Sequence, residues 1–416
     1  MQMIGLVDGN NFFVSCERVF DPSLEGKPVA VLSNNDGCCI SRSNEFKALG
    51  ITMGTPYFQI RNTPGLILRS SNYELYGDLS RRVISVLNTF VPKVEQYSID
   101  EAFIHPEMPE DSDFYTFGCQ VRQRVLKWVG IPCGVGFAPT KTLAKIANHI
   151  GKKLPSGVFV MPSDMREVLE KTPVTEVWGI GRRLAPQLER LGIRNAWQLS
   201  QKDAAEMQKK FSVNLGRTIL ELRGVVCFEE EDPEEASKSI TCSRSFGYPV
   251  VEFRELEESV AVYTAKAAEK LRKEKLCAAG ANIYFQMYPE YEPCPKPAGT
   301  TAITVAFPIP TDDTSRMLSV IFPKLKTIFV DGRRYKKSGV VFFGLESSSS
   351  VQPDLFSPAP KKENSALFKV VDQVNKKFGR GTVFTLSEGT EKKWQMKRDM
   401  LSRSYTTDWS SLLEVR

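Results

Sequence analysis

The 416-residue chain carries 55 lysine and arginine residues against 49 aspartate and glutamate residues, so its net charge is +6 at pH 7 with both histidines neutral. This length allows two to four domains, and no apolar run approaches the roughly 18–20 residues of a membrane-spanning helix. Two histidines and nine cysteines without a C-x-x-C pair argue against a structural zinc site, and free thiols suit a reducing cytoplasm.

The first 162 residues alternate between strands and amphipathic helices, which predicts one α/β unit. The N-terminus has the pattern of a first strand rather than of a signal peptide. In chain order we expect strands at 3–13 and 27–34, a turn and helix at 35–51, a helix at 73–90, a strand at 94–104, a helix at 114–129, a strand at 133–138 and a helix that opens at 139.

Two adjacent acids, Asp100 and Glu101, lie inside "VEQYSIDEAFI" (94–104), a run that otherwise has the pattern of a buried strand. Burying an unpaired carboxylate is costly, so the pair needs a cation or a hydrogen-bond donor. Asp8 stands near the end of the first strand, and three carboxylates converge if the two strands are neighbours in one sheet. Such oxygen ligands suit Mg²⁺, and a pair of ions can promote phosphoryl transfer. The spacing alone fits surface turns equally well.

The stretch after the α/β unit shows only short helical patterns, among them "VTEVWGIGRRLAPQLERLGI" (174–193). We expect two short helices around Gly179 and Gly181, with Arg182 and Arg183 in the first turn of the second helix. Glycines let a backbone approach a phosphate, and a helix N-terminus presents unpaired N–H groups to it. The segment is therefore predicted to bind DNA backbone without reading its sequence, and an ordinary helical turn is the alternative.

A second basic set consists of Lys141, Lys145 and Lys152, in and just after the helix that opens at 139. Lys141 and Lys145 are four residues apart and share a helix face. That face could look towards a triphosphate, and a solvated face is the alternative.

The acidic stretch "EEEDPEEASKS" predicts a solvated linker, and residues 240–345 again alternate strands and helices. The Ser/Pro-rich run that follows predicts a flexible tether. Within it Gln352, Leu355 and Phe356 form a Q-x-x-L-F peptide that resembles motifs that dock on a sliding clamp. A chance Leu-Phe pair that packs back on the body is the alternative.

A basic tail, 361–416, closes the chain. It contains one predicted helix face, and that face suits a core or a partner surface better than a membrane. The residues of this face are Ala366, Leu367, Val370, Val371 and Val374.

Several stretches together resemble the Y-family translesion DNA polymerases, most closely the UmuC-type catalytic subunits of bacterial SOS mutagenic polymerases. The resemblance runs essentially end to end, and the combination of motifs is highly specific. The stretches are "VDGNNFF", "VLSNNDGCCISRS", "SSNYELYGDLS", "YSIDEAF", "GVGFAPTKTLAKIANH", "VWGIGRR" and the tail "WQMKRDMLSRSYTTDWSSLL".

The resemblance implies an α+β multidomain protein with the architecture of a right-handed polymerase. Its expected parts are an α/β palm (1–15 and 75–162), small fingers (16–74), a helical thumb with a helix–hairpin–helix (163–232), a linker (233–239), an α/β little finger (240–345) and a C-terminal extension (346–416). The extension would combine the flexible tether and its clamp-binding peptide with a basic UmuC-type tail.

The resemblance also implies a two-Mg²⁺ site held by Asp8, Asp100, Glu101 and the Gly9 carbonyl, with Asp100 and Glu101 as the catalytic residues. The primer 3′-hydroxyl would attack the α-phosphate of a dNTP and release pyrophosphate. The implied triphosphate contacts are Phe12, Asn44, Lys47 and Lys152, where Asn44 and Lys47 stand at the positions of a Tyr-x-x-Arg pair in some members.

Phe13 stands five residues after Asp8, where the family keeps an aromatic steric gate. Its ring would lie beneath the incoming sugar and fill the space that a 2′-hydroxyl requires. The alternative is that Phe12 and Phe13 are core residues after a strand. Adjacent residues on a strand face opposite sides, so we expect only Phe13 to meet the sugar.

The implied function is template-directed, error-prone translesion DNA synthesis in the SOS response. The implied partners are primed and damaged DNA, dNTPs, a processed UmuD-type dimer, a RecA filament and the β sliding clamp, with no membrane. The expected location is the bacterial cytoplasm, at the nucleoid during DNA damage. A non-catalytic DNA-binding accessory protein is the alternative, but it would not need three intact acids.

Overall fold

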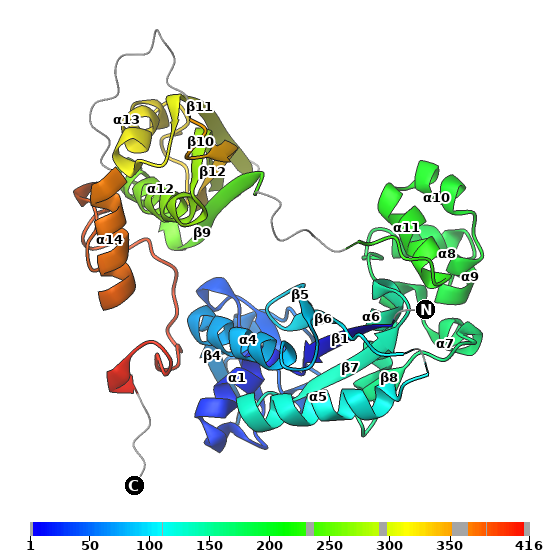
Figure 1. The fold of residues 1–416 in the computed structure, drawn as a ribbon. Helices are drawn as coiled ribbons and strands as arrows, with labels where there is room; N and C mark the ends of the chain where they lie inside the picture. Colours follow the sequence, from blue (N-terminus) through cyan, green and yellow to red (C-terminus); the bar gives the residue numbers. More distant parts are fainter. Residues whose placement is uncertain are drawn as a thin grey trace. The chain divides into compact units, whose positions relative to one another are not determined.

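The computed structural model divides into two compact units (Figure 1). The first consists of Met1–Ser33, Gly37–Asp232 and Met400–Arg416, and the second of Asn34–Asp36 and Pro233–Asp399. The segment expected as one C-terminal extension is thus shared between the units. The residues that the structure describes are 3–109, 111–229, 237–290, 298–351, 365–379 and 381–411.

A five-stranded sheet in the order β5-β6-β1-β7-β8 forms the centre of the first unit. Strand β1 pairs antiparallel with β6 and β7, and β7 pairs parallel with β8. Because β1 lies between two strands and is buried on both faces, its apolar run is nearly continuous. The strands are β1 (Ile4–Gly9), β5 (Lys93–Gln96), β6 (Glu101–His105), β7 (Cys133–Ala138) and β8 (Val158–Val160).

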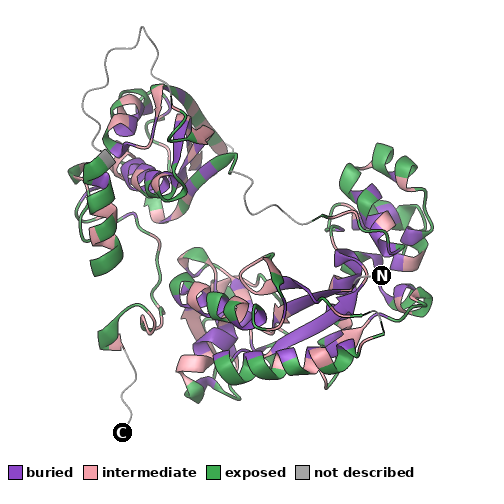
Figure 2. Ribbon diagram, viewed as in Figure 1, coloured by how far each residue is buried: buried purple, intermediate pink, exposed green. Residues whose placement is uncertain are grey.

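Helices cover both faces of this sheet, and its three central strands, β6, β1 and β7, are buried between them (Figure 2). One face shares a core that includes Val7 with α1 (Phe12–Phe20), α4 (Tyr73–Leu87) and α5 (Phe114–Val129). The other face shares a core that includes Leu6 with α6 (Lys141–Gly151). Successive side chains of β1 therefore enter opposite cores, as the twofold period of a strand requires. The predicted helix at 114–129 and strand at 133–138 are confirmed.

The acid-bearing run "VEQYSIDEAFI" is a hairpin, so the expectation of a single strand is wrong. Strand β5 ends before Tyr97, the N–H groups of Tyr97 and Ser98 donate to the Glu101 carbonyl, and β6 begins at Glu101. The Ser98 hydroxyl accepts hydrogen bonds from the N–H groups of Asp100 and Glu101. A serine side chain thus closes the turn locally, which a pattern of apolar residues does not reveal.

A three-stranded sheet in the order β3-β2-β4 follows α1 in the chain. Strand β2 pairs antiparallel with β3 and parallel with β4. Strand β3 was not expected, because its four residues are too few for a twofold pattern to stand out from the surrounding turn. The elements of this part are β2 (Val29–Leu32), β3 (Cys39–Arg42), α2 (Asn44–Ala48), α3 (Tyr57–Ile60) and β4 (Ile67–Ser70).

Short helices make up residues 166–222 of the first unit, as the sequence predicts. Their apolar residues join the core beneath α6, so this part packs against the five-stranded sheet through that helix. The helices are α7 (Arg166–Lys171), the 3-10 turn η3 (Val174–Glu176), α8 (Ala185–Arg190), α9 (Ala196–Ser200), α10 (Ala204–Lys210) and α11 (Val213–Leu222).

The second unit contains an antiparallel sheet in the order β11-β10-β12-β9, with α12 and α13 packed against it. Helix α14 is held to α12 by the Arg272–Asp372 ion pair at 2.6 Å and by the buried Phe368. Leu367 and Val370 of the predicted apolar face are exposed, so these two residues are not core, and a partner surface stays a prediction. The elements are β9 (Ser239–Val250), α12 (Phe253–Glu274), β10 (Leu276–Met287), β11 (Gly299–Thr311), α13 (Thr314–Leu325), β12 (Tyr335–Ser347) and α14 (Ser365–Phe378).

Among the described helices, none has both the length and the apolar composition that crossing a lipid bilayer requires. The Q-x-x-L-F peptide of Gln352, Leu355 and Phe356 lies outside the described residues. Its docking on a clamp stays a prediction.

Candidate active site

Three carboxylates come from neighbouring positions at one end of the five-stranded sheet. Asp8 of β1 is the direct cross-strand partner of Glu101 of β6. The N–H of Gly9 donates to the Asp100 carbonyl at 2.9 Å, which fixes Asp100 beside the same strand end. The strands that the sequence could only suppose to be neighbours are therefore paired, and the three acids lie at the same end of the sheet.

Two lysines of the α6 region neutralise two of these acids. The Lys152 ammonium lies 2.6 Å from the Asp8 carboxylate, and the Lys145 ammonium lies 2.7 Å from the Glu101 carboxylate. Both lysines can reach the acids because α6 packs against β1 and β7. Lys145 also lies over the Tyr97 ring, with its nitrogen 4.3 Å from the ring centroid.

Lys141 does not join this site, although the sequence grouped it with Lys145. Its ammonium lies 2.7 Å from the Glu95 carboxylate, and its side chain is only 4% exposed. Lys141 and Lys145 are one helical turn apart, yet Lys141 forms a buried ion pair with Glu95 and Lys145 contacts Glu101. The sequence left two alternatives for Lys141, a face towards a triphosphate and a solvated face, and its buried ion pair fits neither.

The pKa of Asp8 is raised to about 6. Burial is the largest cause of the rise, the charge and hydrogen bond of Lys152 oppose it, and the charges of Glu101 and Asp100 add to it. Three carboxylates against two contacting ammonium groups leave one negative charge to be balanced. This donor set, made only of hard oxygen ligands, fits a divalent cation such as Mg²⁺.

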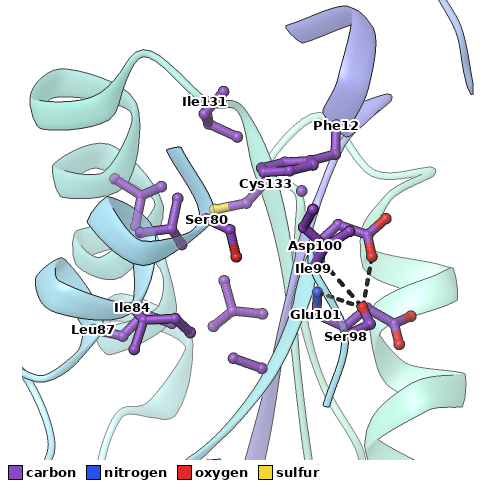
Figure 3. A pocket seen from close by; sticks show the side chains of 15 residues that line it. Phe12, Ser80, Ile84, Leu87, Ser98, Ile99, Asp100, Glu101, Ile131 and Cys133 are labelled. Atoms are coloured by element: carbon purple, nitrogen blue, oxygen red, sulfur yellow. Dashed lines mark hydrogen bonds between the residues drawn. The ribbon is translucent and has the colours of Figure 1, made fainter. Parts of the chain in front are cut away.

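In this arrangement, no three histidine, cysteine, aspartate or glutamate side chains within the described ranges gather around one point where a metal ion could sit. The partners of the acids explain this. Lysines hold Asp8 and Glu101, and the Ser98 hydroxyl donates to Asp100 at 2.6 Å. Figure 3 shows the Ser98–Asp100 hydrogen bond beside a pocket whose opposite wall is apolar and includes Ile84 and Leu87. Core residues form most of its lining, and its volume of about 10 Å³ is far too small for a nucleotide.

Phe12 and Phe13 begin helix α1 and do not continue a strand, which corrects the reason given for separating them. Asn11 before them has φ 48°, in the left-handed region that asparagine tolerates better than most residues, and this turn redirects the chain from β1 into α1. Phe12 is 4% exposed and its side chain lies in the core. Phe13 is half-buried and stacks on Tyr76, with ring centroids 4.6 Å apart and planes 14° apart.

The predicted triphosphate residues Asn44 and Lys47 meet at Asn11. The Asn11 amide donates to Asn44 Oδ1 at 3.0 Å, and the Lys47 ammonium donates to Asn11 Oδ1 at 2.6 Å. Burial lowers the pKa of Lys47, and repulsion from Arg42 and Lys152 lowers it further. Lysines 47 and 152, predicted from different parts of the chain, thus act on each other electrostatically.

Sequence reasoning missed Asn11 and Arg42. Arg42 ends β3 and donates to the Ile51 carbonyl at 2.6 Å. An arginine directly before the predicted helix was the available signal, but β3 had not been recognised. Asn11 offered a signal too, since a second consecutive asparagine after "DG" favours a turn with positive φ.

The glycine turn at 179–181 is exposed, with Ile180 buried beneath it as an anchor. Gly179 has φ 85°, which side-chain-bearing residues rarely adopt, and a Cβ at Gly181 would meet no atom within 4 Å. Arg182 and Arg183 are exposed in the turn before α8 and not inside its first turn, and the element before the glycines is the 3-10 turn η3. The backbone at Gly181 is therefore open to a partner, and two exposed arginines follow it in the chain.

Family models match most of the chain. The model of the impB/mucB/samB family matches residues 7–149 and that of its C-terminal domain matches 237–355, with the IMS family HHH motif between them at 162–193. A domain of unknown function matches residues 365–415.

Known relatives extend over the whole chain. Protein ImpB of Salmonella typhimurium is 42% identical over 428 residues, which covers 99% of each chain, and protein UmuC of Salmonella typhimurium strain LT2 is 42% identical over 424 residues, which covers all of both. DNA polymerase IV 1 of Bacillus subtilis is 26% identical over 90% of each chain.

The fold matches a solved Y-family DNA polymerase chimera of Dbh and Dpo4 with a TM-score of 0.65 at 23% identity, over 83% of this chain and 99% of the chimera. A Dbh ternary complex matches with a TM-score of 0.56. The chain therefore belongs to the impB/mucB/samB family and is a UmuC-type, Y-family, DNA-directed DNA polymerase of error-prone translesion synthesis.

Proposed function

We propose that Asp8, Asp100 and Glu101 hold two Mg²⁺ ions at the centre where this polymerase adds a deoxynucleotide to a primer. The observation that carries the proposal is the pairing of Asp8 with Glu101 across β1 and β6, with Asp100 fixed beside them. When bound, such ions activate the attacking hydroxyl and stabilise the leaving oxygen of an in-line displacement. The Gly9 carbonyl is the fourth proposed protein ligand. The primer 3′-hydroxyl attacks the α-phosphate, and pyrophosphate leaves.

The lysines at the acids have a second role in this proposal. Lys152 lies close enough to Asp8 to form a charge-assisted hydrogen bond, and it is 31% exposed, so its ammonium can turn to a triphosphate. A bound divalent cation would then balance the Asp8 carboxylate that Lys152 leaves. Lys47 and Asn44 approach from α2 and supply further donors. The Phe12 backbone N–H, at the start of α1, supplies a further donor.

Phe13 serves as the steric gate in this proposal, because its ring is half-buried and supported from behind by Tyr76. The glycine turn at 179–181 binds the DNA backbone in this proposal. Its peptide at Gly181 is open, and the two exposed arginines Arg182 and Arg183 follow it directly. In domain terms the five-stranded sheet is the palm, the β3-β2-β4 sheet the fingers, helices α7–α11 the thumb and the second unit the little finger.

The proposed partners are primed and damaged DNA, dNTPs, the β sliding clamp through Leu355 and Phe356, and a processed UmuD-type dimer and a RecA filament through the C-terminal extension. Clamp docking would raise the effective concentration of the enzyme at a primer end. The proposed location is the bacterial cytoplasm, at the nucleoid during DNA damage. Resemblance to UmuC-type subunits supports these assignments.

Asp100→Asn tests the metal site. The amide keeps the size of the side chain but loses the charge that holds a divalent cation, so primer extension should fall by at least about a hundredfold while binding to primed DNA stays near wild type. Asp331→Asn, at an exposed position of the second unit, is the matched control and should extend primers normally. Primer extension by Asp100→Asn at the wild-type rate would exclude this residue as a metal ligand.

A further inference from the structure

The C-terminal segment Met400–Tyr405 packs on the first unit, within the part of the chain that matches a domain of unknown function. The Ser70 N–H donates to the Met400 carbonyl, and the Met400 N–H donates to the Ser70 hydroxyl, each at 3.0 Å. The Met400 side chain packs against the core of the β3-β2-β4 sheet. The segment is therefore fixed at its first residue by two reciprocal bonds and an apolar anchor.

Two residues further on, Ser402 reaches a buried acid. Its hydroxyl donates to Glu17 Oε1 at 3.1 Å, and the Tyr76 hydroxyl donates to the same oxygen at 2.6 Å. Glu17 is 1% exposed and Tyr76 is fully buried. Burial raises the pKa of Glu17, and the hydrogen bonds from Tyr76 and Ser402 lower it, so both hydroxyls favour the ionised carboxylate.

Glu17 connects this contact to the nucleotide side of α1. It lies four residues after Phe13, so both side chains share one face of the helix. Phe13 stacks on the same Tyr76 whose hydroxyl bonds to Glu17, and its ring also meets Tyr73 edge-on at 5.8 Å. Tyr76 is therefore held at its hydroxyl by the acid while its ring face supports Phe13.

The segment also contacts the start of α4, the helix that carries both tyrosines. The Asn72 amide donates to the Ser402 hydroxyl at 3.0 Å, while Asn72 Oδ1 caps α4 at the Leu75 N–H. Ser402 thus bridges α1, through Glu17, to the N-terminus of α4, through Asn72. These are the two helices between which the Phe13–Tyr76 stack lies.

The contacts that anchor the segment and the contact that reaches Glu17 are made by different residues. Tyr405 stacks on Phe20 with centroids 4.9 Å apart, near the end of α1 and away from Phe13. A polar cavity of about 330 Å³ lies beside Glu17, lined by Arg69 and residues 400–403 and 405 among others. Apolar packing therefore does not enclose Glu17 on this side, and the Ser402 hydroxyl is the direct link from the tail to that carboxylate.

We propose that Ser402 and Glu17 are positioning residues for the sugar-facing wall of the nucleotide site. Ser402 and Tyr76 share the Glu17 carboxylate, which fixes the hydroxyl end of Tyr76 and so the ring on which Phe13 rests. The C-terminal segment thereby sets how strictly the polymerase excludes a 2′-hydroxyl. The proposal rests on the proposed role of Phe13 as the gate.

The test measures insertion efficiency, kcat/KM, for a ribonucleotide and the matching deoxynucleotide with the full-length protein. Ser402→Ala should raise the ribonucleotide-to-deoxynucleotide ratio about fivefold, with deoxynucleotide KM unchanged, since a displaced gate admits the extra hydroxyl without weakening the correct substrate. Ser402→Thr retains a hydroxyl and should restore the wild-type ratio. Ser410→Ala is the tail control, because among the described residues that hydroxyl bonds to Asp408 alone.

A double-mutant cycle shows whether Ser402 acts through the gate. Phe13→Ala alone should relax sugar discrimination, and adding Ser402→Ala to it should change the ratio no further. If Phe13→Ala relaxes discrimination but Ser402→Ala leaves the ratio at the wild-type value, even with a lower thermal midpoint, the segment is only a structural brace and the positioning proposal is overturned. If Phe13→Ala leaves the ratio unchanged, the gate assignment itself fails, so the two failures are distinguishable. Additive effects in the double variant would also overturn the positioning role.

Discussion

Phe12 and Phe13 are adjacent on α1 but have different surroundings, so their alanine variants form a matched pair. Phe12 is 4% exposed and its ring packs on the Gly9 backbone, where an added Cβ would lie 2.7 Å from the ring. Phe12→Ala removes a buried ring and should lower the free energy of unfolding by about 3–5 kcal/mol. Phe13 is half-buried, and Phe13→Ala loses mainly its stack on Tyr76 and partial burial, about 1–2 kcal/mol.

The two variants should have opposite rankings in two assays: Phe12→Ala should lose more stability, and Phe13→Ala should lose more sugar discrimination. Denaturant unfolding should show the larger loss of stability for Phe12→Ala. Single-nucleotide insertion, run where both variants are folded, should show a rise of about tenfold or more in relative ribonucleotide efficiency for Phe13→Ala and little change for Phe12→Ala. The assignment is wrong if Phe13→Ala discriminates as well as wild type, or if Phe12→Ala is the variant that admits ribonucleotides.

Three further predictions follow from the sites described. The pKa of Asp8 is raised to about 6 in the folded protein, chiefly by burial, so the folded state holds this proton more tightly than the unfolded chain does. The protonated carboxyl therefore contributes stability near pH 4, and this contribution is lost as the pH rises through about 6. Asp8→Asn should therefore match wild type near pH 4 and become more stable by up to about 3 kcal/mol at pH 7 without metal, and a pH-independent difference in unfolding free energy would contradict this. Gly181→Val, at a position with open space and negative φ, should fold normally but weaken binding to primed DNA of any sequence, and wild-type affinity with an unchanged salt dependence would exclude a phosphate role. Replacing Leu355 and Phe356 with alanine should weaken clamp binding and processivity while distributive synthesis on short templates stays normal, and an unchanged affinity in a clamp titration would refute docking by this peptide.

Local patterns made it reasonable to expect that the acids meet, although spacing alone fitted surface turns as well. Asp8 stands near the end of an apolar run with the pattern of a first strand, and Asp100 and Glu101 interrupt another apolar run. Two buried strands of one α/β unit usually share a sheet, so their polar interruptions had reason to meet. The pairing of Asp8 with Glu101 required only that the two strands be neighbours.

What the sequence did not predict depends on single side chains or on distant contacts. The hairpin in 94–104 forms because the Ser98 hydroxyl takes two backbone N–H groups, and nothing in the apolar pattern distinguishes it from a strand. Lys141 and Lys145 share a helix face, yet one turn decides that Glu95 binds the first and Glu101 the second. The contact of Ser402 with Glu17 joins residues 385 positions apart, which no local signal encodes.

The left-handed turn at Asn11 decides which aromatic ring meets the substrate. Had β1 continued, Phe12 and Phe13 would face opposite sides of a sheet. Glu17 would then lie on the same side as Phe13 but about 13 Å further along the strand. Because the chain turns into a helix instead, Phe12 enters the core while Phe13 and Glu17 lie one turn apart on one face. Tyr76 can then contact both, stacking on the ring and donating to the acid. The ten consecutive residues from Asp8 to Glu17 contain a proposed metal ligand, the proposed gate and the acid bound by the C-terminal segment. One residue with positive φ, Asn11, sets how these three side chains are arranged.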